Sequence, residues 1–275
     1  ADGWTLHVDS VRLEQGVLVS VVGPQRSGKA TLMKILSGIL HPNAGGLFIP
    51  SYMRCLHVSQ DPMLFDKSLW GNLNPFGSSV AEDLALRLLR RVDTELGLAG
   101  SLEKRLGEEF KDPAQRDGNG FAWRSKLSST EQAGVHLARA LLWNPDLLII
   151  EHPTKHFDRR TAGRVINLLR AHVDCKGLET PEKGRESRMQ RTVIYTTDQH
   201  DVAADVSLQL HLNGAVTTVK QVKKAELLTT SAAAHPPRRK SLAAPVVMTP
   251  PRTVGHAHPD LPPLSASSPA LRTSF

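Results

Sequence analysis

A run of nine residues near the N-terminus, GPQRSGKAT, has the residue types and the spacing of a loop that binds phosphate. Its two glycines let the backbone turn tightly and bring N–H groups onto phosphate oxygens. The lysine ammonium can reach the terminal phosphates of a nucleotide, and a helix that starts here would add the partial positive charge of its N-terminus. The run therefore predicts a phosphate site made by Gly23, Gln25, Arg26, Ser27, Gly28, Lys29, Ala30 and Thr31.

One position in this loop lacks the side chain that a metal-dependent nucleotide site uses. The residue after the lysine is ordinarily serine or threonine, whose hydroxyl binds Mg²⁺. This chain has Ala30 there. We therefore expect the loop to hold phosphate and to hold Mg²⁺ weakly or not at all.

The segments around the loop alternate between strand patterns and helix patterns, which predicts an α/β fold with a parallel sheet. The apolar run directly before the loop is typical of a strand buried in such a sheet. A hairpin with an Asn213-Gly214 turn is expected late in the chain, over 207–219. The other expected strands are 53–58, 147–150 and 192–197, and the expected helices are 31–40, 82–91, 132–143 and 162–173.

Composition separates a folded domain, predicted over 1–230, from a tail. Residues 231–275 hold nine of the 18 prolines and show no periodicity, so we expect this tail to be disordered. The net charge is +7, but seven of the basic residues and only two acidic ones lie in 221–275. Because the remaining body is close to neutral, the charge does not indicate a nucleic-acid partner.

Other features of the sequence bear on the surroundings of the protein. No apolar run approaches the length that a bilayer crossing needs. Cys55 and Cys175 have neither disulfide nor metal spacing, which favours a reducing compartment. The chain begins with Ala1 rather than methionine, so we expect it to be a segment of a longer protein. The segment 174–190 is rich in charge and is expected to be a solvated loop.

Further motifs follow the phosphate loop in a fixed order: HVSQDPMLF at 57–65, SLWGNL at 68–73, LSSTEQ at 127–132, and LARALL, then NP, leading into LLII at 147–150. The pairs PT and FD come next, at 153–154 and 157–158. In this order and at these spacings the motifs resemble the nucleotide-binding domain of ATP-binding cassette (ABC) transporters, and the run at 68–73 resembles its exporter branch. The resemblance covers about residues 5–230.

The resemblance implies a P-loop NTPase core with an inserted helical subdomain over about 66–143. It implies ATP and Mg²⁺ as cofactors, with Gln60 as the glutamine that meets the metal and the attacking water. It also implies a second cassette as a head-to-tail partner, whose nucleotide would be contacted by Ser128, Ser129 and Thr130. The transmembrane domains of a transporter would be the other partner, with the chain on the cytoplasmic face of the membrane.

Several catalytic positions of the family carry unusual residues here. Glu151 stands at the metal-side carboxylate, one methylene longer than aspartate, so Glu151 and Gln60 are the candidate metal ligands. His152 stands at the general base, and its ordinary pKa of about 6.5 leaves a neutral imidazole at pH 7. Asp198 stands at the switch histidine and would repel a γ-phosphate. The candidate catalytic residues are therefore His152, Glu151, Gln60 and Asp198.

Two charged replacements leave alternatives open. Arg26 replaces a loop glycine: if this position needs φ > 0 the arginine strains the backbone, or its charge offsets nearby acidic groups. The signature pattern Leu-Ser-Gly-Gly-Gln here ends in Ser129, Thr130 and Glu131, which brings negative charge toward a partner's polyphosphate. Trp4 is either an adenine-stacking residue or an ordinary strand residue.

The leading hypothesis is a cassette domain that binds ATP and couples nucleotide state to transmembrane transport, with impaired hydrolysis. The alternative is an inert pseudo-cassette that regulates or scaffolds. A third hypothesis, a soluble ABC ATPase outside transport, is disfavoured by the exporter-like run at 68–73. His200 is either a replacement for the switch histidine or a solvent-facing histidine at a helix N-terminus, and the second alternative is favoured. These departures leave open whether the chain is an ATPase.

Overall fold

The computed structural model describes residues 5–75, 77, 80–112, 121–181, 183–198, 204–223 and 246–247. Trp4 and His200 lie outside these ranges. The predicted tail, 231–275, also lies outside them except for a two-residue strand, β9 (Val246–Val247), which pairs in parallel with β3 (Leu47–Phe48).

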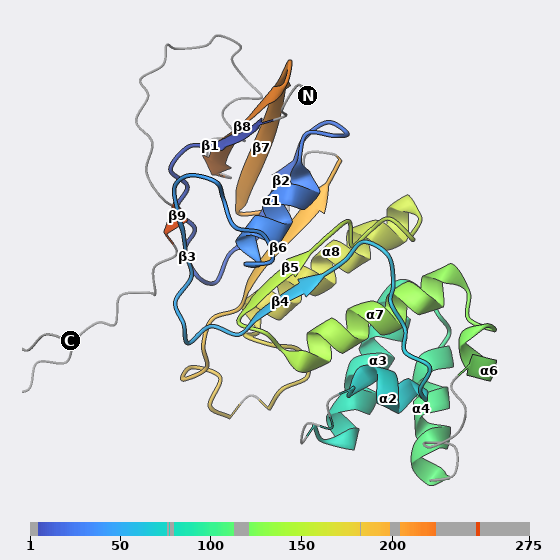
Figure 1. Cartoon of the computed structure of the whole chain (residues 1–275). Coiled ribbons are helices and arrows are strands. Elements are labelled where there is room, and N and C mark those ends of the chain that lie inside the picture. The colour runs from blue at the N-terminus through green and yellow to red at the C-terminus, as the bar shows by residue number, and fades with distance from the viewer. Residues whose placement is uncertain are drawn as a thin grey trace, which may run out of the picture.

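The centre of the fold is a seven-stranded sheet with the order β1-β8-β7-β2-β6-β5-β4 (Figure 1). All neighbouring strands in it are parallel except β7 and β8, which form an antiparallel hairpin. The strands are β1 (Thr5–Val8), β2 (Leu18–Val22), β4 (Cys55–Val58), β5 (Leu147–Ile150), β6 (Thr192–Thr197), β7 (Val206–Asn213) and β8 (Val216–Lys223).

The side chains of the buried strands alternate between the two faces of the sheet, with α1 packed on one face and α8 on the other. Every residue of β2 and β5 is buried. Leu147 and Ile149 pack with α1 (Lys29–Leu36), whereas Leu148 and Ile150 belong to the core that contains α8 (Arg159–Asp174). Successive side chains of a strand point to opposite faces, so the apolar runs of β2 and β5 serve both cores.

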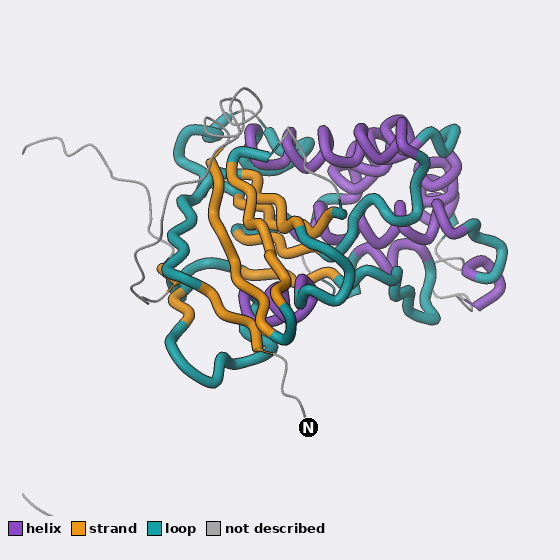
Figure 2. Tube along the Cα trace, turned by 90° about the horizontal axis from the view of Figure 1, so that it is seen from above, coloured by secondary structure: helices purple, strands orange, loops and turns teal. Residues whose placement is uncertain are grey.

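Between β4 and β5, the described elements are all helices: α2 (Leu69–Leu73), α3 (Glu82–Leu96), α4 (Ser101–Lys111), α6 (Phe121–Arg124) and α7 (Ser129–Trp143). They gather to one side of the sheet (Figure 2). The helix α3 turns an apolar stripe inward that includes Leu88, Val92 and Leu96, which pack with Leu102 and Leu106 of α4 in one core.

Capping residues explain where the predicted helices differ from the observed ones. The helix α1 ends at Leu36 rather than near 40, because Gly38 adopts φ +74° and its N–H bonds back to Ile35. The helix α8 begins at Arg159 rather than 162, because the side chain of Asp158 accepts a hydrogen bond from Thr161 N. Ser128 moves the start of α7 in the same way, from 132 to Ser129.

The hairpin is confirmed, and its strands run further than expected. The turn contains Gly214 at φ +60°, and β7 pairs with β8 from Val206–Lys223 to Asn213–Val216.

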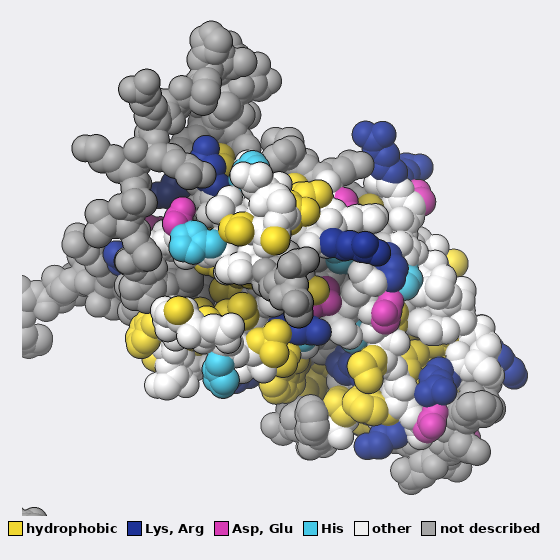
Figure 3. All heavy atoms as spheres, turned by 45° about the horizontal axis from the view of Figure 1, so that its top comes forward, with side chains coloured by type: hydrophobic (Ala, Val, Ile, Leu, Met, Phe, Trp, Pro, Cys, Tyr) yellow, Lys and Arg dark blue, Asp and Glu magenta, His cyan; other side chains and the backbone are white. Residues whose placement is uncertain are grey.

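The charged segment after α8 forms turns where it is described, but Leu178 in it is buried against the helical core. Lys and Arg side chains lie in several separate places on the face shown in Figure 3.

Candidate nucleotide site

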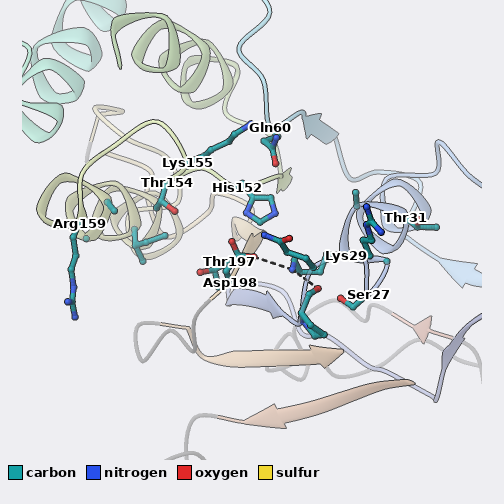
Figure 4. Close-up of a pocket in the computed structure, with 18 of the residues that line it drawn as sticks. Ser27, Lys29, Thr31, Gln60, His152, Thr154, Lys155, Arg159, Thr197 and Asp198 are labelled. Carbon is teal, nitrogen blue, oxygen red and sulfur yellow. Dashed lines mark hydrogen bonds and ion pairs between the residues drawn. The ribbon is translucent and has the colours of Figure 1, made fainter. Parts of the chain in front are cut away.

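A cavity of about 1340 Å³ lies at the carboxyl ends of the parallel strands. The loop at 24–31 follows β2, Gln60 follows β4 and His152 follows β5, while Thr197 ends β6 and Asp198 follows it. The carboxyl ends of parallel strands meet at one edge of a sheet, and this edge is where such folds bind ligands. Figure 4 shows these segments converging on the cavity.

The phosphate loop has the backbone that its glycines predict. Gly28 adopts φ +87° at the N-cap of α1. A Cβ at Gly23 would lie 2.8 Å from both Ser27 Oγ and Leu210 Cβ, so no larger residue fits there without a shift. No side chain caps the N-terminus of α1, and its first turn has no acidic residue. This end of α1 is therefore open to an anion.

Lys29 is held inside the loop by three oxygen atoms. Its Nζ donates to Gly23 O at 2.6 Å and to Pro24 O at 3.1 Å. It also forms an ion pair with Asp198 Oδ1 at 3.2 Å, one of the interactions drawn in Figure 4. The side chain of Lys29 is only 7% exposed, whereas that of Asp198 is 63% exposed. The lysine is thus fixed, and the carboxylate lies at the solvent side of the pair.

Two other loop residues have unusual surroundings. Arg26 has φ +62°, so this position does need φ > 0 and the arginine strains the backbone. Ser27 is 1% exposed, and its hydroxyl has no hydrogen-bond partner among the described residues. A buried hydroxyl without a partner is costly. The Ser27 hydroxyl therefore remains available to form a hydrogen bond with a ligand of the phosphate loop.

His152 faces the cavity directly after β5 (Figure 4). Its backbone has φ +43°, and its N–H donates to Thr196 Oγ1 at 2.7 Å. Burial is the main reason that the pKa of His152 is lowered from 6.5; Lys29 lowers it further, while Asp198 acts in the opposite direction. A lowered pKa keeps the imidazole neutral at pH 7, the form that can accept a proton.

Glu151 is placed differently from the other candidate catalytic residues. Its Oε1 lies 3.1 Å from His57 Nε2 on the neighbouring strand β4, and the two side chains are 12% and 16% exposed. Glu151 is not among the described residues that line the cavity. Its carboxylate would have to turn toward the cavity to bind a metal there, so its role as a metal ligand stays a prediction.

Gln60 lines the cavity, as expected of its position after β4. Sequence reasoning did not assign to the site several other residues that line it: Thr154, Lys155, Arg159 and Thr197. Their signal was their place at or after the carboxyl ends of the predicted strands 147–150 and 192–197. Across the described residues, no group of three or more His, Cys, Asp or Glu side chains is arranged to hold a metal ion.

The signature residues do not line this cavity in the described structure. Ser128 caps α7, and Glu131 completes a capping box: Ser128 Oγ accepts from Glu131 N at 3.2 Å, and Glu131 Oε2 accepts from Ser128 N at 2.9 Å. Ser101 Oγ donates to Glu131 Oε1 at 3.0 Å. The carboxylate of Glu131 is therefore bound by its own chain.

A mostly parallel sheet between helices, with a phosphate loop leading into a helix, defines a P-loop nucleotide-binding fold. The sequence profile described as ABC transporter matches residues 6–155, and the chain belongs to this family as an ABC nucleotide-binding domain. Within the described residues, no helix combines the length and the apolar character that crossing a membrane requires.

Curated relatives are similar over part of their length. The lipoprotein-releasing system ATP-binding protein LolD of Acinetobacter baylyi is 30% identical over 58% of this chain and 71% of its own. An uncharacterized ABC transporter ATP-binding protein of Mycobacterium tuberculosis is 29% identical over 57% of this chain, which spans 63% of that relative. The Fe(3+) ions import protein FbpC of Agrobacterium fabrum is 27% identical over 72% of this chain, which spans 51% of that relative.

Solved structures agree on the fold. The ATP-binding subunit of an ABC transporter superposes with a TM-score of 0.54 at 18% identity, covering 79% of this chain and 82% of the other. A bacterial Atm1-family ABC exporter with ATP bound gives a TM-score of 0.53 at 19% identity, covering 79% of this chain and 35% of the other.

Proposed function

We propose that this chain is the cassette domain of an ABC transporter that binds ATP and couples nucleotide state to transport, with impaired hydrolysis. The observation that carries the proposal is the phosphate loop: a fixed lysine beside an open helix N-terminus, at the edge where four strands end. These residues fit the phosphates of a nucleotide. Bound ATP would supply the free energy difference between two states of the transporter.

The same cavity suits Mg²⁺ poorly. Ala30 has no hydroxyl to offer, and the carboxylate of Glu151 pairs with His57. Of the two candidate ligands only Gln60 lines the cavity. We therefore propose that ATP binds with little dependence on Mg²⁺, and we assign no step of the reaction to the metal.

Hydrolysis would rest on His152, the candidate base that faces the cavity. Its imidazole is available as a proton acceptor, but among the described residues no carboxylate forms a hydrogen bond with its ring. A well-positioned base contributes roughly 10²–10⁴ in rate, so a displaced one should leave turnover at least ~100-fold below that of an intact cassette. His152→Ala should then lower the residual phosphate release further.

The test is titration of the full chain with ATP, in Mg²⁺ and in a chelator, followed by a phosphate-release assay. We expect binding of similar strength in both buffers. Turnover should be well below about 1 s⁻¹, which is the lower end of the ordinary enzyme range. Ala30→Ser returns a hydroxyl and should restore part of the dependence on Mg²⁺. A large Mg²⁺ enhancement in the parent chain would contradict the metal part of the proposal.

The proposed partners are a second cassette, paired head-to-tail, and transmembrane domains at the cytoplasmic face of the membrane; nucleic acid is not proposed. Two large apolar side chains beside Gln60 support a protein partner, because Met63 is 68% exposed and Phe65 is 46% exposed. Their segment is fastened to α7: Arg139 donates to Met63 O and lies 5.2 Å from the Phe65 ring. A movement of α7 would therefore shift this surface.

The alternative is a pseudo-cassette that regulates or scaffolds without turnover. Two side-chain pairs favour it, since Lys29 is engaged by Asp198 and Glu151 by His57 within the same chain. Absence of any ATP binding by the full chain, with Lys29→Met as the reference for no specific binding, would favour this alternative over the first proposal.

A further inference from the structure

The carboxylate of Asp198 is bound to the lysine of the phosphate loop in the structure. An ammonium has three donors, and the three oxygens around Lys29 Nζ are Gly23 O, Pro24 O and Asp198 Oδ1. The two carbonyls belong to the loop that forms the cavity. Asp198 is the anionic one of the three and its side chain is 63% exposed, so it is the group that a terminal phosphate would displace.

Charge makes this competition depend on the length of the phosphate chain. Asp198 is the only acidic side chain among the described residues that line the cavity, whereas Arg26, Lys155 and Arg159 are basic. The cavity as a whole therefore attracts a polyanion, and repulsion is confined to the neighbourhood of Lys29. A shorter phosphate chain can bind the loop N–H groups and leave Asp198 on the lysine, but a longer chain cannot do so without bringing like charges together.

We propose that Asp198 occupies the place of a terminal phosphate, so that the cavity prefers a nucleoside diphosphate to a nucleoside triphosphate. This inference rests on the proposed nucleotide site. Ala30 adds to the preference, because a triphosphate carries more charge for a metal to mask and this loop lacks the hydroxyl that would help to hold the metal.

The test compares ADP and ATP binding by calorimetry, in a chelator, for the full chain and for Asp198→Asn. Asparagine keeps the shape of aspartate and removes its charge. Asp66→Asn is the matched control: Asp66 is also 63% exposed and paired with an arginine, Arg124, at 2.8 Å, but it does not line the cavity. Asp198→Glu tests whether charge suffices.

The parent chain should bind ADP more tightly than ATP. For Asp198→Asn we expect the ratio of ATP to ADP affinity to rise about five-fold, in line with the roughly 1 kcal/mol that an exposed ion pair can contribute. Asp66→Asn should leave the ratio unchanged, and Asp198→Glu should keep the preference for ADP. Thermal melts of each variant check that the fold is intact, which the exposure of both aspartates favours.

Other outcomes separate this inference from the proposed function. If the parent chain binds ATP more tightly than ADP, and Asp198→Asn changes the ratio no more than Asp66→Asn does, the inference is overturned while nucleotide binding stands. If the parent chain and all variants bind neither nucleotide, both the inference and the proposed function are wrong.

Discussion

The helices α1 and α7 begin at the two turns that the family resemblance connects to nucleotide, yet their N-termini are built differently. At α1 the N-cap is Gly28, no side chain caps the helix, and its first turn has no acidic residue. At α7 Ser128 caps the helix and Glu131 closes a capping box, with Ser101 holding the same carboxylate. One N-terminus is open, and the other already holds an anion from its own chain.

The difference shows that two departures from a family pattern can have opposite physical meanings. The first N–H groups of a helix have no partner within it, and they attract an anion only where nothing else binds them. Ala30 removes one possible metal ligand and leaves the N–H groups of α1 available. Glu131 uses part of the binding capacity of α7. We therefore expect the phosphate loop to be the stronger of the two half-sites.

The largest expected effect comes from removing the fixed lysine. Lys29→Met should weaken nucleotide binding by about 10- to 100-fold, since hydrogen bonds to charged groups contribute roughly 1.5–3 kcal/mol. Calorimetry on the full chain measures it. Glu131→Ala is the paired variant, and it should leave binding to a single chain nearly unchanged. Equal losses for both variants would show that the two helix starts do not differ as described.

The capping box predicts an effect on stability instead. Glu131→Ala should lower the free energy of unfolding by about 1 kcal/mol, because it removes the acceptor for Ser128 N. Glu131→Gln should lose less, since glutamine also completes a capping box. Urea unfolding followed by circular dichroism gives both values. If Glu131→Ala is as stable as the parent, the carboxylate does not stabilise α7.

Substitution of Arg26 should give a smaller effect, and two variants separate the contribution of its charge from that of its backbone. A residue other than glycine in the left-handed conformation destabilises the fold by roughly 1–2 kcal/mol. Glycine removes this cost, but it raises the entropy of the unfolded chain, which lowers the stability by about 0.4–1 kcal/mol. Arg26→Gly should therefore stabilise the fold by about 0.5–1 kcal/mol. Arg26→Ala keeps the backbone cost and removes the charge. If both variants weaken nucleotide binding equally, the arginine acts through its charge.

The sequence predicted β5 and β6 to the residue, because each is a continuous apolar or β-branched run between polar segments. Of the candidate residues that it named, Lys29, Gln60, His152 and Asp198 line the cavity because all four lie beyond the ends of parallel strands, whereas Glu151 does not line it. The helices named from periodicity were found, and their starts were misplaced wherever an N-cap such as Ser128 or Asp158 was overlooked.

The sequence did not reveal which side chains from distant segments pair with each other. The pair His57–Glu151 spans 94 residues, and it forms because β4 and β5 are neighbours with His57 opposite Ile149. Nothing local to Glu151 reveals that its carboxylate has this partner instead of facing the cavity. The pair Lys29–Asp198 likewise requires that β2 and β6 lie side by side.

The smallest effect is a dependence on pH, which tests whether the N-terminus of α7 binds a charged Glu131. Burial acts to raise the pKa of Glu131, but hydrogen bonds from Ser128 and Ser101 outweigh it and lower the pKa below the ordinary 4.5. A carboxyl whose pKa is lower in the folded state binds fewer protons there than in the unfolded chain. Its stabilising contribution is therefore present above pH 4.5 and is lost as the pH falls through the folded pKa.

Glutamine at this position has no charge to lose. The stability difference between the parent and Glu131→Gln, measured by urea unfolding, should thus favour the parent by a few tenths of a kcal/mol at neutral pH and shrink on acidification below 4.5. Asp66→Asn serves as a control for general acid effects, because Asp66 lies outside the capping box. A difference that stays constant with pH would mean that the bound carboxylate is not charged, and the contrast between α1 and α7 would then rest on hydrogen bonding alone.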